Sequence, residues 1–157
     1  MKYFFLFLSA FVFAQQTKSV DFKNVNAHVT INSNNKTING KVIYTFEVLK
    51  PIDTIKIDAQ NMAFTEVELN NKTIPFTTNG KELLLIYPFQ KGKNSVQFSY
   101  EAKPKQTLYF VGSEDTDNLQ IWTQGQGKYT SHWFPSFDDV NEKVIFNIEI
   151  AFDSKYQ

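Results

Sequence analysis

The sequence contains no cysteine and no arginine, and it has only two histidines. Without cysteine the chain forms no disulfide, offers no thiol nucleophile and supplies no thiolate ligand for zinc. All sixteen basic residues are lysines, so the bidentate guanidinium clamps that proteins favour for phosphate groups are missing. These absences argue against a disulfide scaffold, a cysteine hydrolase and a phosphate-handling enzyme.

An excess of charge of either sign is also missing. The sixteen lysines balance sixteen acidic residues, which gives a formal net charge of zero. A chain without net charge creates no long-range field that would attract nucleic acid or an anionic membrane surface. We therefore expect no nucleic-acid partner.

The short motifs that mark common hydrolytic sites are absent as well. The sequence has no Gly-x-Ser-x-Gly and no His-Glu-x-x-His. His28 and His132 lie more than one hundred positions apart, and we interpret both as structural residues. Ser131 precedes His132, but neighbours in the chain do not form a catalytic pair by adjacency alone. We expect no catalytic residue, no metal ligand and no cofactor within this chain.

The amino end has the pattern of a secretory signal peptide. Lys2 precedes an apolar run over residues 3–13, and the small residue Ala14 follows it. The run is shorter than the roughly 20 residues that span a bilayer, so we expect no membrane anchor. We predict a signal peptide at residues 1–14, a single domain at residues 15–157, and a secreted or periplasmic protein. The alternative is a buried or interfacial N-terminal segment.

Apolar and polar residues alternate, or short apolar runs recur, along most of the remaining chain. These stretches are residues 25–32, 38–49, 52–58, 63–69, 83–87, 96–100 and 143–152. Turn residues separate them, and Asn79-Gly80 is typical of a tight hairpin. No window of eleven or more residues has an apolar stripe at helical spacing. The pattern predicts an all-β fold of antiparallel sheets, arranged as a sandwich.

One stretch near the C-terminal end has a composition of its own. The strand-like residues 119–122 run directly into Thr123-Gln124-Gly125-Gln126-Gly127. In an extended backbone Gln124 and Gln126 project from the same face, and the glycines permit a sharp turn and a close approach. A carboxamide can donate to and accept from a peptide backbone or amino end. The residues alone leave two alternatives, a solvated turn and a ligand contact.

The residues that follow extend this stretch into a longer pattern. Phe134-Pro135 comes eight residues after Gln126, and Phe137-Asp138-Asp139 and Lys143 come next. In order and spacing the pattern resembles the N-terminal domain of the aminopeptidase N family of zinc metallopeptidases, which includes the leukotriene hydrolase. That family has Thr-Gln-x-Glu or Thr-Gln-x-Gln, then Phe-Pro, then aromatic-Asp-Glu-Pro-x-x-Lys.

Three positions depart from that family pattern. Ser131 stands where arginine is usual, Asp139 where glutamate is usual, and Val140 where proline is usual. Residues 38–42 and 55–59 are similar, more weakly, to early strands of the same family.

The resemblance implies a saddle-shaped all-β domain that covers one side of a catalytic domain. It implies that Gln124 and Gln126 are substrate-binding residues that contact the N-terminal residue of a peptide. The expected partners are therefore a peptide N-terminus and the protein's own catalytic domain. Zinc is expected in that catalytic domain, because its His-Glu-x-x-His and Gly-x-Met-Glu-Asn segments are not among these residues. The chain therefore resembles one part of a zinc metallo-aminopeptidase, and we expect this N-terminal β-domain to be truncated at its C-terminal end.

The alternative function is a non-catalytic secreted β-sandwich that serves as a binding or adhesion module. Residues 112–118 invite a calcium-loop interpretation, but their ligand spacing fails and a solvated loop is preferred.

Two further expectations concern the end of the motif. For Asp138 and Asp139 we expect turn capping and pairing with Lys143 rather than acid–base catalysis. The expected core anchors are Trp133, Phe134 and Phe137.

Overall fold

The structure, a computed structural model, describes residues 16–112 and 119–154. The predicted signal peptide and most of the acidic loop at residues 112–118 lie outside these ranges. The elements are η1 (Gln16–Lys18), β1 (Val20–Asn32), β2 (Thr37–Val48), β3 (Ile52–Asp58), β4 (Ala63–Leu69), β5 (Lys72–Thr73), β6 (Phe76–Thr78), β7 (Glu82–Phe89), β8 (Gly92–Ala102), β9 (Leu108–Val111), β10 (Gln120–Thr123), η2 (Thr130–His132) and β11 (Ile145–Ala151). Within the described ranges, no helix has the length and apolar character needed to cross a membrane.

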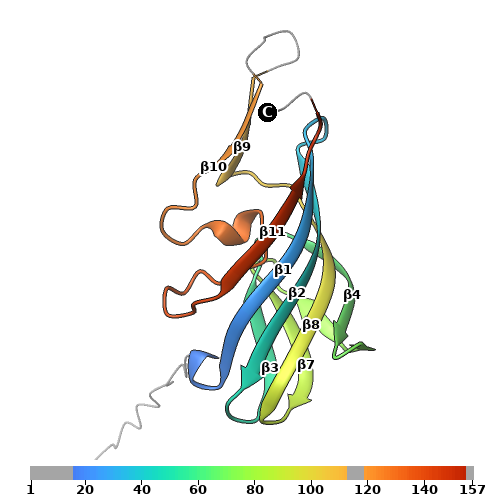
Figure 1. The fold of residues 1–157 in the computed structure, drawn as a ribbon, viewed down its shortest axis with the longest axis vertical. Helices are drawn as coiled ribbons and strands as arrows, with labels where there is room; N and C mark the ends of the chain where they lie inside the picture. Colours follow the sequence, from blue (N-terminus) through green and yellow to red (C-terminus); the bar gives the residue numbers. More distant parts are fainter. Residues whose placement is uncertain (1–15, 113–118, 155–157) are drawn as a thin grey trace, which may run out of the picture.

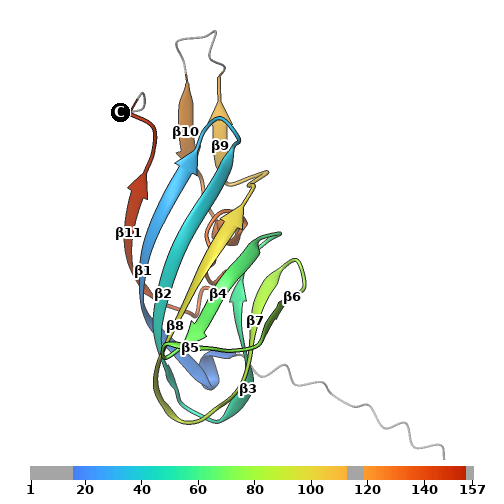
Figure 2. The same cartoon turned by 90° about the vertical axis from the view of Figure 1, so that its right-hand side faces the viewer.

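The strands of the described residues form three sheets. The largest has six strands in the order β11-β1-β2-β8-β4-β5, and a three-stranded sheet has the order β3-β7-β6. Figures 1 and 2 show the small sheet beside one end of the large, twisted sheet, with the β9–β10 hairpin projecting at the other end. The prediction of an all-β domain is confirmed.

The alternating sequence pattern places one face of the large sheet in the core. In β2, Val42, Tyr44 and Phe46 are buried, whereas Lys41 on the opposite face is exposed. The buried face packs with residues of β3 and β7, including Ile55. We call the buried side of the large sheet its inner face and the solvent side its outer face.

One strand pair differs from the predicted antiparallel arrangement. β11 runs parallel to β1, with Ala27 opposite Ile148. Alternation is the same in parallel and antiparallel strands, so the sequence pattern does not reveal direction. β8 and β11 both run parallel to β1, because β8 and β1 each pair antiparallel with β2. Parallel strands of one sheet need a long crossover, and the chain between β8 and β11 supplies it.

β11 lies at the edge of the sheet and leaves apolar side chains exposed. Phe146 and Ile150 are 46% and 47% exposed, although they lie opposite the buried residues Val25 and Val29 of β1. Their side chains therefore project on the inner face, beyond the part that the core covers. An edge with such apolar surface is suited to contact with another domain or chain.

A glycine in β2 makes room for a tyrosine in the neighbouring strand. Gly40 lies directly opposite Tyr100 of β8, and a Cβ atom at position 40 would lie 2.2 Å from Cε1 of the tyrosine ring. Tyr100 is buried on the inner face, and three atoms of its ring lie within 3.0 Å of the position that this Cβ atom would take. This contact sets the position of a tyrosine that holds the crossover.

Candidate functional site

The two glutamines lie where the β9–β10 hairpin joins the crossover. The backbone N–H of Gln124 donates to the carbonyl of Thr107 at 2.8 Å, which adds one rung after the Thr123 and Leu108 pair. The side chains of Gln124 and Gln126 are both exposed. Their carboxamides are therefore accessible to another molecule, as a binding site requires.

The backbone at Gln126 is not extended, contrary to the sequence expectation. β10 ends at Thr123, and residues 126–128 form a turn in which Gly127 has a φ of 88°. Glycine adopts this left-handed conformation without the steric cost of a side chain. A Cβ atom on Gly125 would lie 3.1 Å from Oγ1 of Thr130, so this backbone lies close to the next loop. A tight turn, rather than strand alternation, therefore presents the second glutamine.

Hydrogen bonds fix the crossover loop to the end of β3. Asp58 and Ser136 exchange two backbone hydrogen bonds of 2.9 Å, and the N–H of Gln60 donates to the carbonyl of Ser131 at 2.8 Å. The carboxylate of Asp58 also accepts the N–H of Asp138 at 2.7 Å. These bonds form an isolated antiparallel β-bridge that joins the loop after the glutamine turn to the end of β3.

One aspartate of the motif caps a turn as predicted, and the other binds a serine instead of the expected lysine. Oδ2 of Asp138 accepts the hydroxyl of Ser131 at 2.7 Å, so its expected pairing with Lys143 is wrong. Oδ1 of Asp139 accepts the N–H of Asn141 at 3.0 Å, which confirms the predicted turn capping. No ion pair joins Asp139 to Lys143 in the described part of the chain.

Two buried tyrosines connect the loop to the large sheet. The hydroxyl of Tyr44 donates to the carbonyl of Pro135 at 2.6 Å, and that of Tyr100 donates to the carbonyl of Trp133 at 3.2 Å. Burial raises the pKa of both tyrosines above the usual range, so both hydroxyls keep the proton that they donate. The loop is thereby fixed to β2 and β8 as well as to β3.

The aromatic residues of the motif are core anchors, as predicted. Trp133 and Phe134 are buried, and Phe137 is partly buried against the core. The rings of Phe137 and Phe22 have centroids 4.4 Å apart. These rings stabilise the loop that follows the glutamine turn.

A half-buried glutamate closes the far end of the crossover. Oε1 of Glu142 accepts the N–H of Phe22 at 3.2 Å, on the edge of β1 just before β11 begins to pair. Burial raises the pKa of Glu142 to about 7, and the negative charges of Asp21 and Asp139 add to this rise. The hydrogen bond from the Phe22 N–H and the positive charge of Lys23 act in the opposite direction and lower the pKa. The carboxyl is therefore partly protonated at neutral pH.

The raised pKa of Glu142 predicts that the stability of the domain depends on pH. The pKa of Glu142 is about 7 in the folded protein and 4.5 in the unfolded chain, so the folded state binds this proton more tightly. The resulting contribution to stability is complete below pH 4.5 and is lost as the pH rises through about 7. A shift of this size is worth about 3 kcal/mol at most, and solvent at the half-buried carboxyl reduces the expected loss to about 1 kcal/mol. Glu142→Gln should abolish the loss, because an amide keeps the acceptor and carries no charge. Urea unfolding of the wild type and of Glu142→Gln at a series of pH values from 4.5 to 8 measures this loss of stability.

Salt separates the causes of this effect. The burial contribution should persist in 1 M salt, whereas repulsion from Asp21 and Asp139 should be screened. Parallel stability profiles for the wild type and Glu142→Gln would contradict the assignment.

The histidines lie on different sides of the large sheet. His28 is exposed on the outer face, where its Nδ1 is 3.4 Å from Oε2 of Glu149. His132 belongs to the crossover on the inner face, with its Nε2 2.9 Å from Nε2 of Gln106. The residues described include no group of three histidine, cysteine, aspartate or glutamate side chains that could hold a metal ion.

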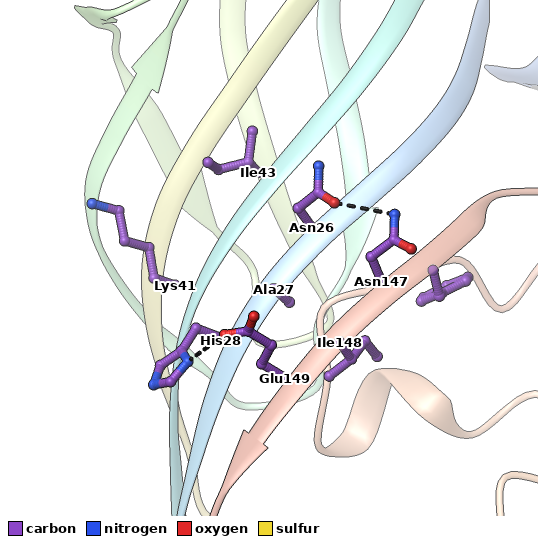
Figure 3. A pocket seen from close by; sticks show the side chains of 9 residues that line it. Asn26, Ala27, His28, Lys41, Ile43, Asn147, Ile148 and Glu149 are labelled. Carbon is purple, nitrogen blue, oxygen red and sulfur yellow. Dashed lines mark hydrogen bonds and ion pairs between the residues drawn. The ribbon is translucent and has the colours of Figure 1, made fainter.

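A shallow groove on the outer face is the other candidate for ligand binding. It has a volume of about 630 Å³ and lies over β1, β2 and β11, where Figure 3 shows His28, Lys41 and Glu149. Asn147 donates to Oδ1 of Asn26 at 3.1 Å across its floor. The groove lies on the opposite side of the sheet from the glutamine turn, and the residues that line it include no serine, threonine or cysteine that could act as a hydroxyl or thiol nucleophile.

The fold and the site together define a β-domain that presents a polar turn from a rigid crossover. Residues 21–157 match the Peptidase M1 N-terminal domain. The chain belongs to this family, as the sequence motif predicted.

Similar proteins agree with the family and set the extent of the match. Aminopeptidase N of Lactococcus lactis subsp. lactis is 25% identical over an alignment of 141 residues, and the match covers 85% of this chain and 16% of that protein. Leukotriene A4 hydrolase from Saccharomyces cerevisiae has the same fold, with a TM-score of 0.75, 17% identity, and coverage of 92% of this chain and 26% of that one. A mutant M1 zinc metallopeptidase from Deinococcus radiodurans, bound to a Tyr-Ser-Ala substrate, has a TM-score of 0.70, 14% identity, and coverage of 86% and 33%. The chain thus spans a small part of each of these proteins.

Proposed function

We propose that this chain is the N-terminal domain of a secreted zinc aminopeptidase and shapes the cleft that binds the peptide substrate. The single observation that carries the proposal is the exposure of Gln124 and Gln126 on a turn that is held by hydrogen bonds to the rest of the domain. A rigid base is what a binding group needs to hold its partner at a fixed position. Family membership and the Tyr-Ser-Ala complex of the Deinococcus protein support the assignment to peptide binding.

In this proposal the two carboxamides bind the N-terminal residue of the peptide. Their oxygens accept hydrogen bonds from the ammonium group, and their NH₂ groups donate to a carbonyl. A glutamine adds no net charge, so a carboxylate elsewhere in the whole protein is needed for charge attraction. Zinc, held by another domain, would supply an activated water that attacks the peptide bond.

The proposal includes secretion, which the pattern of residues 1–14 supports. Sequencing the amino end of the mature protein tests it, because cleavage after Ala14 leaves Gln15 as the first residue. A mature protein that still begins with Met1 would contradict secretion by this route.

The second candidate function is a non-catalytic secreted binding or adhesion module. The polar groove on the outer face is the observation that favours it. Reading the gene beyond the codon for Gln157 discriminates between the two functions. An open frame with Gly-x-Met-Glu-Asn and His-Glu-x-x-His supports the aminopeptidase, and a stop codon supports the module.

The experiment that tests the proposed site uses Gln124→Ala and Gln126→Ala in the full-length protein. Each variant should raise KM for alanine 4-nitroanilide about tenfold, because a hydrogen bond to a charged group is worth about 1.5 kcal/mol or more. The matched control is Gln90→Ala, which removes an exposed glutamine from the turn between β7 and β8. Turnover and KM that stay at the wild-type values in both variants would show that the glutamines do not contact the substrate.

A further inference from the structure

The β9–β10 hairpin carries a stacked aromatic pair on its outward side. Trp122 and Tyr109 lie opposite each other in the register, and their rings have centroids 4.5 Å apart at an interplanar angle of 31°. Trp122 is 44% exposed, and its neighbour on this side, Val111, is also 44% exposed. A large aromatic surface in contact with water is costly for a fold that does not use it.

The opposite side of the hairpin packs against the hydrophobic core of the domain. Leu108 is buried, and Phe110 and Ile121 pack against the hydrophobic core. Successive side chains of a strand point to opposite sides, so the stacked pair faces away from the core. Folding of the hairpin therefore leaves the stacked pair free for another contact.

The stacked pair lies on the same side of the hairpin as the first glutamine. Trp122 and Gln124 are two residues apart, and the Gln124 N–H bond to Thr107 extends the strand ladder through position 124. Side chains at i and i+2 share one side and are about 7 Å apart along the strand. One amino-acid residue of a ligand can therefore contact both the carboxamide and the aromatic surface.

We propose that Trp122 and Tyr109 form the wall that packs against the side chain of the N-terminal residue of the bound peptide. This inference rests on the proposed function of Gln124 and names the class of substrate, which is a peptide with a large apolar or aromatic first residue. Rings in an offset or tilted stack offer a flat apolar surface that favours such side chains. No described residue of the hairpin carries a charge, so the wall offers no ion pair to an acidic or basic first residue.

The test compares 4-nitroanilides of phenylalanine, alanine and lysine as substrates of the full-length protein. Trp122→Ala should lower the ratio of kcat/KM for phenylalanine to that for alanine about fivefold. Trp122→Phe keeps a ring and should retain more than half of the preference. Val111→Ala, on the same side but farther from Gln124, should leave the ratio unchanged.

Other outcomes overturn the inference and separate its failure from that of the proposed function. If Gln124→Ala raises KM for all three substrates while Trp122→Ala leaves the ratio unchanged, the proposed contact of Trp122 and Tyr109 with the substrate is wrong, whereas the proposed contact of Gln124 is supported. If Trp122→Ala mainly lowers activity on lysine, the rings bind a cation and the apolar preference is wrong. If Trp122→Ala lowers the Tm without changing the ratio of the two kcat/KM values, Trp122 and Tyr109 contact another domain rather than the substrate. Failure of the wild type to hydrolyse any of the three overturns both proposals.

Discussion

Replacing Gly40 by alanine is expected to lower the free energy of unfolding by about 3 kcal/mol. The added Cβ atom would lie 2.2 Å from a carbon of the Tyr100 ring, well inside van der Waals contact. The ring has little room to move, because it packs against Phe64 and Phe134 and its hydroxyl is bonded to the carbonyl of Trp133. In an open strand the same change would be favourable by about 0.5–1 kcal/mol, since glycine is a poor strand residue. The sign of the effect therefore reports the contact with Tyr100.

A double-mutant cycle isolates this contact. In a Tyr100→Leu background the ring is gone, and Gly40→Ala should cost less than 1 kcal/mol. Urea unfolding of the four proteins measures the coupling between the two positions. Equal costs of Gly40→Ala in both backgrounds would show that the ring does not need the glycine.

Tyr44→Phe is expected to lower the free energy of unfolding by about 2 kcal/mol. The change removes one oxygen, and with it the 2.6 Å hydrogen bond to the buried carbonyl of Pro135. A buried acceptor that loses its donor pays the full cost of its lost hydration. The loop should also open more often, so the amide of Ser136, which donates to Asp58, should exchange its hydrogen faster.

The matched control for this change is Tyr87→Phe, which removes a hydroxyl from a side chain that is 42% exposed. It should alter stability by less than about 0.5 kcal/mol. If Tyr44→Phe is as mild as Tyr87→Phe, the hydroxyl does not hold the crossover.

The strands were predictable because one side of each meets the core. Alternation of apolar and polar residues predicted β1 and β2, and Asn79-Gly80 predicted the turn between β6 and β7. Gly80 has a φ of 81°, and Oδ1 of Asn79 accepts the N–H of Glu82, so both turn residues act as expected.

The direction of β11 was not predictable from its own residues. Its alternation specifies which side chains face inward, whereas its direction depends on the crossover from β8. The burial of the aromatic anchors followed from their size, but the hydrogen bonds that hold the loop did not. Tyr44 and Tyr100 lie more than thirty positions from their acceptors, and nothing local in the sequence indicates these pairs.

The site was predictable in part. The sequence pattern correctly placed Gln124 directly after a strand, because β10 ends at Thr123. The extended geometry assumed for Gln126 was wrong, because Gly127 adopts a left-handed conformation and turns the chain. The role of Asp138 was also wrong, since Ser131, at a position where the family has arginine, binds its carboxylate instead of leaving it for a lysine. Burial of a carboxyl such as Glu142 depends on tertiary packing and has no signal in the motif.

The most direct test of the proposed site is a crystal structure of the full-length protein with a peptide whose amino end is free. We predict that a carboxamide oxygen of Gln124 or Gln126 lies within about 3.2 Å of the ammonium nitrogen of the peptide. An ammonium group that is bound elsewhere, with both carboxamides directed into solvent, would contradict the account.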